Sequence, residues 1–518
     1  MAVSTNKIVI SNLFWRLIER FGAQIVTFVV SIVLARLLDP VVYGTIALVT
    51  VFTAILQVFV DSGLGTALIQ KKDSDDLDFS TVFYFNLLVC VVLYLGLFFF
   101  APLIADFYDQ SELTSVIRVL SLTVVISGVK NVQQAYVSKH MMFKRFFFAT
   151  LGGTIGAAIL GITLAYLGYG VWALVAQHLF NLAVDTIILW ITVKWRPKRT
   201  FSFQRLKILL SFGWKMLVSS LLDTGYKELR TLIIGKRFSK EDLAYYNRGQ
   251  QFPGFIATNV CTSIDSVLLP TMSSEQGSCD RVRSMTRRAI KTSTYIMMPM
   301  MVGLAVCAEP IVRIVLTEKW LPTVFFLRIF CITYAFYPIH TANLNAIKAM
   351  GRSDLFLILE IIKKSVGIIT ILVTMFISVE AMAYSLLATS LLSQIINSWP
   401  NKKLLGYTYL DQVKDMLPQI LLSLVMGGIV FCITFVPIYD WAQLLIQVPL
   451  GVAIYLGLSK LFKVESYTYV ANTARGFLGS KKNNKNNYND KDGQHNNTVI
   501  HGYDQSEEDE QKEDINND

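Results

Sequence analysis

The sequence is short of charged residues. Asp, Glu, Lys and Arg make up only 16% of its 518 residues, whereas 53% are hydrophobic. A soluble globular protein carries about 25% charged residues because its surface must stay in water. The low charge therefore excludes an ordinary soluble enzyme. The apolar residues recur in stretches of about twenty, separated by short polar loops, and this is the length that crosses a bilayer as a helix.

The sequence also lacks the motifs of metal and nucleotide sites. Its six cysteines form no CxxC pair and no Cys/His cluster, and all but Cys279 fall in apolar stretches. Neither a metal site nor a disulfide framework is therefore expected. Gly152, Gly153, Gly156 and Gly161 lie inside one apolar stretch with no strand before it, which is typical of close helix packing and not of a phosphate-binding loop. We expect no metal and no organic cofactor.

Fourteen stretches are long enough to cross the membrane as helices, and we predict an all-α polytopic membrane protein. The connections reach only about 20 residues, so no soluble catalytic domain is inserted between spans. About ten residues precede the first span, too few for a cleaved signal peptide, so we expect that helix to stay. The predicted spans are residues 12–37, 43–68, 80–102, 116–137, 146–167, 171–193, 208–234, 252–273, 292–316, 323–346, 354–378, 381–399, 416–437 and 441–462.

Lys and Arg are concentrated in alternate loops. One set of loops holds most of them, from Lys71 to Lys414, and the other set holds few, among them Arg36, Lys236 and Lys319. Because cytoplasmic loops are the basic ones, both termini are expected in the cytoplasm, which fits an even number of spans. The net charge of +10 is then mostly loop charge that sets the topology, and it does not indicate a nucleic-acid partner.

The chain resembles itself after about 200 residues. Trp15-Arg16 in the first predicted span matches Trp214-Lys215 in the seventh, and residues 34–38 match residues 234–238. Chance similarity between two apolar helices is the alternative. If the repeat is genuine, two six-helix lobes share one orientation and are related by a pseudo-two-fold axis along the membrane normal. Repeats of this kind place a substrate path between the lobes.

Four regions follow from this repeat. We expect an N-terminal six-helix lobe at 1–200, a C-terminal six-helix lobe at 201–405, two additional transmembrane helices at 406–465 and a polar cytoplasmic tail at 466–518. The tail is Asn-rich and then acidic, so we expect disorder from about residue 480. A solvated tether is the simpler interpretation of the tail, and a docking segment for a partner is the alternative.

Two predicted spans, one in each lobe, carry a stripe of charge. The stripe of the first span comprises Arg16, Glu19, Arg20 and Gln24. The stripe of the seventh comprises Lys215, Asp223, Lys227 and Arg230. The spacing in each case puts the side chains on one face of a helix. A charge inside the membrane costs about 2.5–3.5 kcal/mol, so such a face is expected to point to protein or to a water-filled cavity.

Other ionisable and polar groups lie within predicted spans. Each by itself is explained by an internal ion pair or by a position near the interface, but a mixed, net-basic set on several helices is typical of a hydrated cavity that accepts an anion. These groups include Asp61, Lys130, Gln133, Gln134, His178, Asn181, Asp185, Asp265, Arg313, Arg328, His340, Glu360, Lys363 and Lys364.

Two roles are assigned within this set. Lys and Arg would receive phosphate or carboxylate groups, and Asp and Glu would balance the charge or bind a coupling proton or sodium ion. The candidate anion-attracting residues are Arg16, Arg20, Lys130, Lys215, Lys227 and Arg230. The candidate coupling or gating residues are Glu19, Asp61, Asp223 and Asp265.

Several motifs resemble one known family. Asn12-Leu13-Phe14-Trp15-Arg16, Ala35-Arg36-Leu37-Leu38-Asp39-Pro40, and the string from Asp61 to Gln70 (DSGLGTALIQ) look like the bacterial oligosaccharide flippases of the multidrug/oligosaccharidyl-lipid/polysaccharide exporter superfamily. Leu232-Ile233-Ile234-Gly235-Lys236, followed by Tyr245-Tyr246-Asn247-Arg248, is similar to the second lobe of these proteins. The resemblance covers roughly residues 5–465 and is greatest to exporters of colanic-acid or teichuronic-acid type. The Asp61–Gln70 string is its most specific part.

The resemblance implies a fold, a substrate and a place. It implies two six-helix lobes around a central cavity, two extra C-terminal helices and alternating access. The implied substrate is an undecaprenyl-pyrophosphate-linked repeat unit, moved to the outer leaflet of the bacterial inner membrane for O-antigen, capsule or exopolysaccharide synthesis. The implied partners are this lipid-linked oligosaccharide and membrane lipids, with the polysaccharide polymerase and the chain-length machinery as further candidates. Coupling to an ion is common in the superfamily.

Three alternatives stay open. A multidrug or cation antiporter of the same superfamily would be expected to have a less basic cavity. A membrane-embedded polysaccharide polymerase or ligase would need a large loop outside the membrane, and the loops here are short. A structural scaffold would gain nothing from costly charges within its spans.

Overall fold

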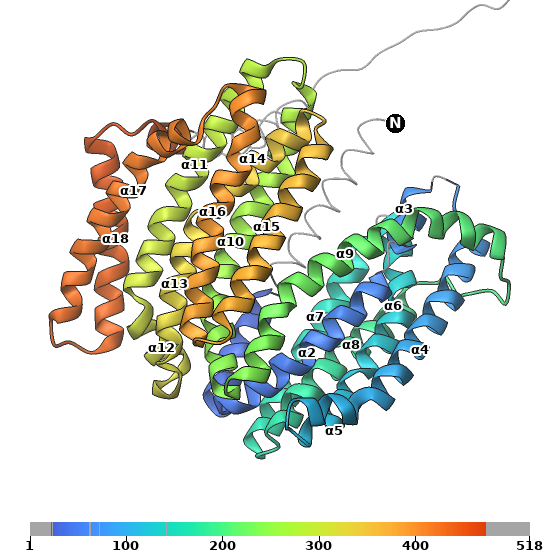
Figure 1. The fold of residues 1–518 in the computed structure, drawn as a ribbon. Coiled ribbons are helices and arrows are strands. Elements are labelled where there is room, and N and C mark those ends of the chain that lie inside the picture. The colour runs from blue at the N-terminus through green and yellow to red at the C-terminus, as the bar shows by residue number, and fades with distance from the viewer. Residues whose placement is uncertain (1–21, 23, 62–63, 72, 141, 473–518) are drawn as a thin grey trace, which may run out of the picture. The chain divides into compact units, whose positions relative to one another are not determined.

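The computed structural model describes residue 22 and residues 24–61, 64–71, 73–140 and 142–472. It divides into two compact units, residues 1–457 and 458–518. The part of the chain that is described consists of helices joined by loops and contains no strand (Figure 1). The prediction of an all-α membrane protein is confirmed, because ten of the helices are long and apolar enough to span a bilayer.

The helices form two consecutive runs along the chain, and the first run ends before residue 193. The helices of the first run are Gln24–Leu37, α2 (Pro40–Asp61), α3 (Leu64–Gln70), α4 (Asp76–Phe107), α5 (Glu112–Leu120), α6 (Leu122–Lys139), α7 (Phe143–Tyr166) and α8 (Val171–Thr192). The helix α5 and the helix α6 together form one candidate span, Glu112–Lys139.

The second run begins after a ten-residue extended linker at 193–202. Its helices are α9 (Phe203–Arg237), α10 (Lys240–Ser274), α11 (Cys279–Val306), α12 (Ala308–Leu316), η1 (Glu318–Trp320), α13 (Thr323–Ala335), α14 (Tyr337–Ala349), α15 (Ser353–Thr374) and α16 (Val379–Leu405). Two further long helices follow, α17 (Tyr409–Cys432) and α18 (Asp440–Leu461), with the short η2 (Ile433–Phe435) between them.

Four of the predicted spans fall outside the ten. Gln24–Leu37 and Thr150–Tyr166 are shorter apolar helices. The helices α9 and α15 are long enough but carry the charged residues that the sequence places inside spans. The predicted count of fourteen is compatible with this set and stays a prediction.

Several predicted helix boundaries were wrong, and two of them are instructive. The eighth span was expected to begin at 252, but α10 begins at Lys240, because Ser239 and Asp242 form a capping box that starts the helix three turns earlier. The ninth was expected as one helix over 292–316, but the chain breaks at Cys307 into α11 and α12. In both cases polar or basic residues in the first turns of a helix hid its start from a search for apolar runs.

The two runs of helices pack in the same order. The fifth and sixth spans of each run lie side by side, as α7 with α8 and α15 with α16. In both runs the second helix packs on the fourth span. In the first run α2 packs on α5 and α6, and in the second run α10 packs on α13 and α14. The helix α17 packs on α11. This correspondence supports the internal repeat seen in the sequence.

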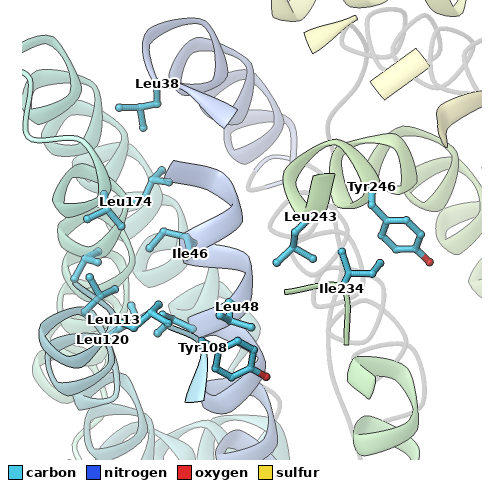
Figure 2. Packing of buried hydrophobic residues seen from close by; sticks show 14 of the residues in the cluster. Leu38, Ile46, Leu48, Tyr108, Leu113, Leu120, Leu174, Ile234, Leu243 and Tyr246 are labelled. Atoms are coloured by element: carbon cyan, nitrogen blue, oxygen red, sulfur yellow. The ribbon is translucent and has the colours of Figure 1, made fainter. Parts of the chain in front are cut away.

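A cluster of buried apolar side chains joins the two runs. Leu48 and Tyr108 come from the first run, and Ile234, Leu243 and Tyr246 come from the second (Figure 2). Gly235 allows this contact, since a Cβ at that position would lie 2.7 Å from Leu48 Cδ1. The two runs are therefore held together at the start of α2, the end of α9 and the start of α10, within residues 35–48 and 232–249.

Candidate functional site

A group of charges lies where α9 packs on α15. The carboxylate of Asp223 pairs with Lys227 at 2.6 Å, one turn later on α9, and with Lys364 of α15 at 3.2 Å. The Lys227 side chain is 68% exposed, whereas that of Lys364 is 27% exposed. One carboxylate is thus shared by two ammonium groups. If the more exposed Lys227 moves away, Asp223 still has Lys364 as its partner. We call Asp223, Lys227, Glu360, Lys363 and Lys364 the α9–α15 cluster.

A glycine sets the geometry of this cluster. A Cβ at Gly367 would overlap the Tyr226 hydroxyl and would lie 2.8 Å from Tyr226 Cζ. The Tyr226 ring therefore needs the bare backbone of α15 at this point. Lys364 Nζ lies 5.9 Å from the centre of the same ring. The close approach of the two helices thereby brings Lys364 within reach of Asp223.

The rest of the cluster is more enclosed. Lys363 pairs with Glu360 at 2.6 Å, with side chains 14% and 26% exposed. Within these five side chains three ammonium groups stand against two carboxylates, and Glu228 of α9 also interacts electrostatically with Lys227. Because both charges of the Lys363–Glu360 pair come from α15, this pair leaves α9 free to move relative to it.

Arg230 is placed differently from Lys227, although both were predicted to attract an anion. It is buried, and its guanidinium donates to Met382 O and, at 2.9 Å, to Ser385 Oγ, both on α16. These bonds use the guanidinium to hold α9 against α16. The structure does not bring Arg230 together with the exposed ammonium group of Lys227.

In the first run the charges are paired across α6 and α8. Lys130 forms an ion pair with Asp185, and the two side chains are 14% and 10% exposed. The predicted anion-attracting Lys130 is thus neutralised by a carboxylate. Gly153 of α7 faces the same turn of α8, where a Cβ would lie 2.8 Å from Asn181 O.

Two predicted coupling residues are bonded by amides. Asp61 Oδ1, at the end of α2, accepts from Asn131 Nδ2 of α6 at 3.1 Å and from Gln57 Nε2 at 3.3 Å. Asp265 of α10 accepts from Asn345 Nδ2 of α14 at 2.6 Å. Among the described residues neither carboxylate has a Lys or Arg within ion-pair distance, although Lys130 interacts electrostatically with Asp61 from further away. Each run therefore holds one carboxylate on its second helix, bonded to its fourth span.

The remaining predicted residues cannot be placed. Arg16, Glu19 and Arg20 lie outside the described residues, and the Lys215 side chain does as well. Their assignments stay predictions. Asp185, Glu360, Lys363 and Lys364 were recognised as charges within spans but received no role, and Asn131 and Asn345 were missed. The available signal for Asn131 was its place next to Lys130 in the sequence.

A separate ionic network lies at the start of α4. Arg205 of α9 pairs with Asp75 at 2.7 Å and with the buried Asp78 at 3.2 Å, and Lys71 pairs with Asp78 at 2.6 Å. The Asp78 backbone N–H and the Arg205 guanidinium hold the pKa of Asp75 below its usual value. This network anchors the start of α9 to the first run.

Metal-ligating groups are not gathered in the structure as far as it is described. No three His, Cys, Asp or Glu side chains in that part of the chain lie where they could hold a metal ion together.

Comparison with known proteins agrees with the arrangement of helices. A family model described as polysaccharide biosynthesis protein matches residues 33–325, more than half of the chain. The chain belongs to this family. The succinoglycan biosynthesis transport protein ExoT of Rhizobium meliloti is 25% identical over 61% of this chain and 64% of its own length. The match to ExoT thus leaves about a third of that relative uncovered.

Two other relatives are covered more fully. The teichuronic acid biosynthesis protein TuaB of Bacillus subtilis is 23% identical over 68% of this chain and 73% of its own. The lipopolysaccharide biosynthesis protein WzxC of Escherichia coli is 23% identical over 76% of this chain and 82% of its own. The resemblance read from the sequence motifs is therefore confirmed at the level of the family.

Solved structures show the same fold. The lipid II flippase MurJ in an inward closed conformation aligns with a TM-score of 0.71 at 17% identity, over 86% of this chain and 98% of its own. A multidrug resistance MATE family transporter in an inward-facing conformation aligns with a TM-score of 0.59 at 15% identity, over 74% of this chain and 94% of its own. The chain is a multi-pass membrane protein with the fold that these transporters share.

Proposed function

We propose that the protein flips an undecaprenyl-pyrophosphate-linked oligosaccharide repeat unit across the bacterial inner membrane by alternating access. The product would supply O-antigen, capsule or exopolysaccharide synthesis. The observation that carries the proposal is the α9–α15 cluster, a lysine-rich group on two membrane helices of a polysaccharide biosynthesis family member. The names of ExoT, TuaB and WzxC, which are transport and biosynthesis proteins of bacterial polysaccharides, support it.

The chemistry of the cluster suits a pyrophosphate. Lys227 is the group best able to exchange partners, since it is exposed and Asp223 keeps Lys364 when Lys227 leaves. An ammonium group is a compact charge that can follow a phosphate without a fixed geometry. A partner carboxylate also keeps the cationic site from binding its cargo too tightly for release. The predicted Arg16, Arg20 and Lys215 would extend the same basic surface.

Asp61 and Asp265 would couple or gate the cycle. A carboxylate bonded to an amide, with no Lys or Arg in direct contact, is less fully compensated than one in an ion pair, so it has capacity for a proton or a sodium ion. Asp223 differs from these two because two ammonium groups already compensate it. We therefore assign ion coupling first to Asp61 and Asp265 and gating to Asp223. Both H+ and Na+ remain candidates.

The membrane placement follows from the loop charges. Both termini would be cytoplasmic, and the contact between the two runs at residues 35–48 and 232–249 would face away from the cytoplasm. The protein would act as a transporter and not as an enzyme, handing its cargo to the polymerase and chain-length machinery. The multidrug antiporter is disfavoured as the alternative, because a cationic drug would be repelled by the three lysines of the α9–α15 cluster.

The test is a deletion of the gene in the source bacterium. Lipid-linked repeat units are expected to accumulate on the cytoplasmic face, and the polymer is expected to disappear from the cell surface. The wild-type gene should reverse both effects. Intact surface polymer without accumulation would overturn the proposal.

A further inference from the structure

The two runs of helices meet in a close backbone contact. A Cβ at Gly44 of α2 would overlap the carbonyl oxygen of Lys240 and would lie 2.7 Å from its carbonyl carbon. The contact continues in the apolar cluster of Leu48, Ile234 and Leu243 (Figure 2). We call the contact between residues 31–48 of the first run and residues 232–249 and 314–320 of the second run the seal.

Hydrogen bonds to backbone carbonyls cross the seal. Trp320 Nε1 donates to Ala35 O at 2.8 Å, and Lys319 Nζ donates to Arg36 O at 3.1 Å. In the opposite direction, Arg36 donates to Ile314 O at 2.9 Å. Trp320 is fully buried, so this bond lies inside the seal and not at its rim. The seal is therefore well packed and hydrogen-bonded.

Arg248 lies inside the same seal. Only 6% of the residue is exposed. Its guanidinium lies 4.5 Å from the ring centre of Tyr43 and 5.4 Å from that of Trp320, and it donates to Ser31 O at 3.2 Å and to Gln251. In the part of the chain that is described, no Asp or Glu pairs with it. The buried Lys130, in contrast, has Asp185.

A buried cation without a counter-ion favours the open state of such a contact. Aromatic faces and neutral carbonyls recover only part of the lost hydration, since a cation–π contact stabilises a desolvated charge by less than its burial costs. Separation of the seal would return Arg248 to water or to an anion. Replacement of a buried charge by an apolar side chain of similar size is often neutral or stabilising.

We propose that Arg248 keeps the seal reversible, acting as a built-in destabilising charge that offsets the close packing around Gly44 and Trp320. Without this charge the apolar contact and the interlobe hydrogen bonds would hold the transporter closed on that side. Arg248 is thus a positioning residue for the opening step. The inference rests on the proposed function in one respect, which is the placement of the seal on the side of the membrane away from the cytoplasm.

The experiment measures opening of the seal directly. Ser31→Cys, in a full-length chain whose native cysteines are replaced and which still transports, is labelled in intact cells with a membrane-impermeant thiol reagent. Arg248→Met should lower the labelling rate several-fold and lower transport with it, whereas Arg248→Lys should stay near the parent in both. Gly44→Ala should raise the labelling rate several-fold, because its Cβ forces the backbones apart.

Controls separate the outcomes. Gly254→Ala, on α10 like Arg248, should change neither labelling nor transport, since the nearest neighbour of the added Cβ would lie 3.8 Å away. The amount of each variant in the membrane is measured in parallel, and Gly44→Ala and Arg248→Lys keep the test decisive if Arg248→Met does not accumulate. Unchanged or faster labelling of a well-expressed Arg248→Met would overturn the inference. The labelling requires no lipid-linked substrate, so failure of the proposed function leaves this result readable.

Discussion

Lys364 of α15 pairs with Asp223 of α9 at 3.2 Å, and the two residues lie 141 positions apart in the chain. Neither helix is apolar enough to be identified as a span by composition alone, because of charges such as these. The pair nevertheless lies on helices that pack inside a membrane protein. A charge pair that lowers the hydropathy of its own helices is most readily explained by a role in transport.

Removal of the exposed ammonium group should affect transport more than folding. Lys227→Ala and Lys364→Ala are each expected to reduce polymer export by an order of magnitude or more, since the anion loses a charge partner. The amount of protein in the membrane should stay unchanged, and Lys207→Ala, at the start of α9, is the matched control. Export at the wild-type level in both variants would show that the α9–α15 cluster does not contact cargo.

The charged stripes predicted from the sequence can be tested in the same assay. Arg16→Ala and Lys215→Ala should each abolish export without a change in membrane level, because each stripe is expected to face the cargo. Normal export in both variants would remove these two residues from the candidate site.

The contact between Gly367 and Tyr226 predicts a loss of stability. Gly367→Ala should lower the free energy of unfolding by about 1–3 kcal/mol, because overpacking outweighs the gain in helix propensity. Thermal unfolding in detergent measures this loss. Gly428→Ala on α17 is the control, since no neighbour lies within 4 Å of its added Cβ, and it should be neutral or stabilising by up to about 1 kcal/mol. Equal unfolding temperatures for the two variants would contradict the packing.

The Lys130–Asp185 pair should behave as a buried ion pair. Lys130→Met leaves Asp185 buried without compensation and should cost about 3–5 kcal/mol. The double variant with Asp185→Leu should recover much of that loss, because it removes the stranded charge. A double-mutant cycle on the unfolding temperature measures the coupling. Additive losses would mean that the two side chains do not compensate each other.

Acid should loosen the network at the start of α4. The folded-state pKa of Asp75 is below its unfolded value, so its contribution is present above about pH 4 and is lost as the pH falls through the folded-state pKa. Asp75→Ser keeps a cap for α4 and removes the titration. The unfolding temperature of the wild type should therefore fall more steeply between about pH 4.5 and 3 than that of Asp75→Ser. Parallel acid curves would contradict the assignment.

The sequence predicted the fold further than it predicted the site. Apolar stretches of about twenty residues and the match of residues 34–38 to 234–238 were enough for an all-helical membrane protein with an internal repeat. Helix ends such as Lys240 were missed because capping residues, and not hydropathy, decide them.

Side-chain partners could not be predicted in the same way. Helical spacing puts Asp223 and Arg230 on one face, seven residues apart, but it does not tell which neighbouring helix each meets. Asp223 meets α15 and Arg230 meets α16, so one stays in the charged cluster and the other is buried. Likewise, the pairing of Asp61 with Asn131 depends on packing between α2 and α6.

The most direct test of the central claim is translocation by the purified protein in proteoliposomes. The lipids would carry either an undecaprenyl-pyrophosphate-linked oligosaccharide or the same oligosaccharide on undecaprenol, and an impermeant glycosidase would report which leaflet holds the sugar. We predict movement of the pyrophosphate-linked lipid by the wild type, little movement of the uncharged analogue, and little movement of either by the Lys227→Ala/Lys364→Ala variant. Equal movement of both lipids by wild type and variant would contradict the account.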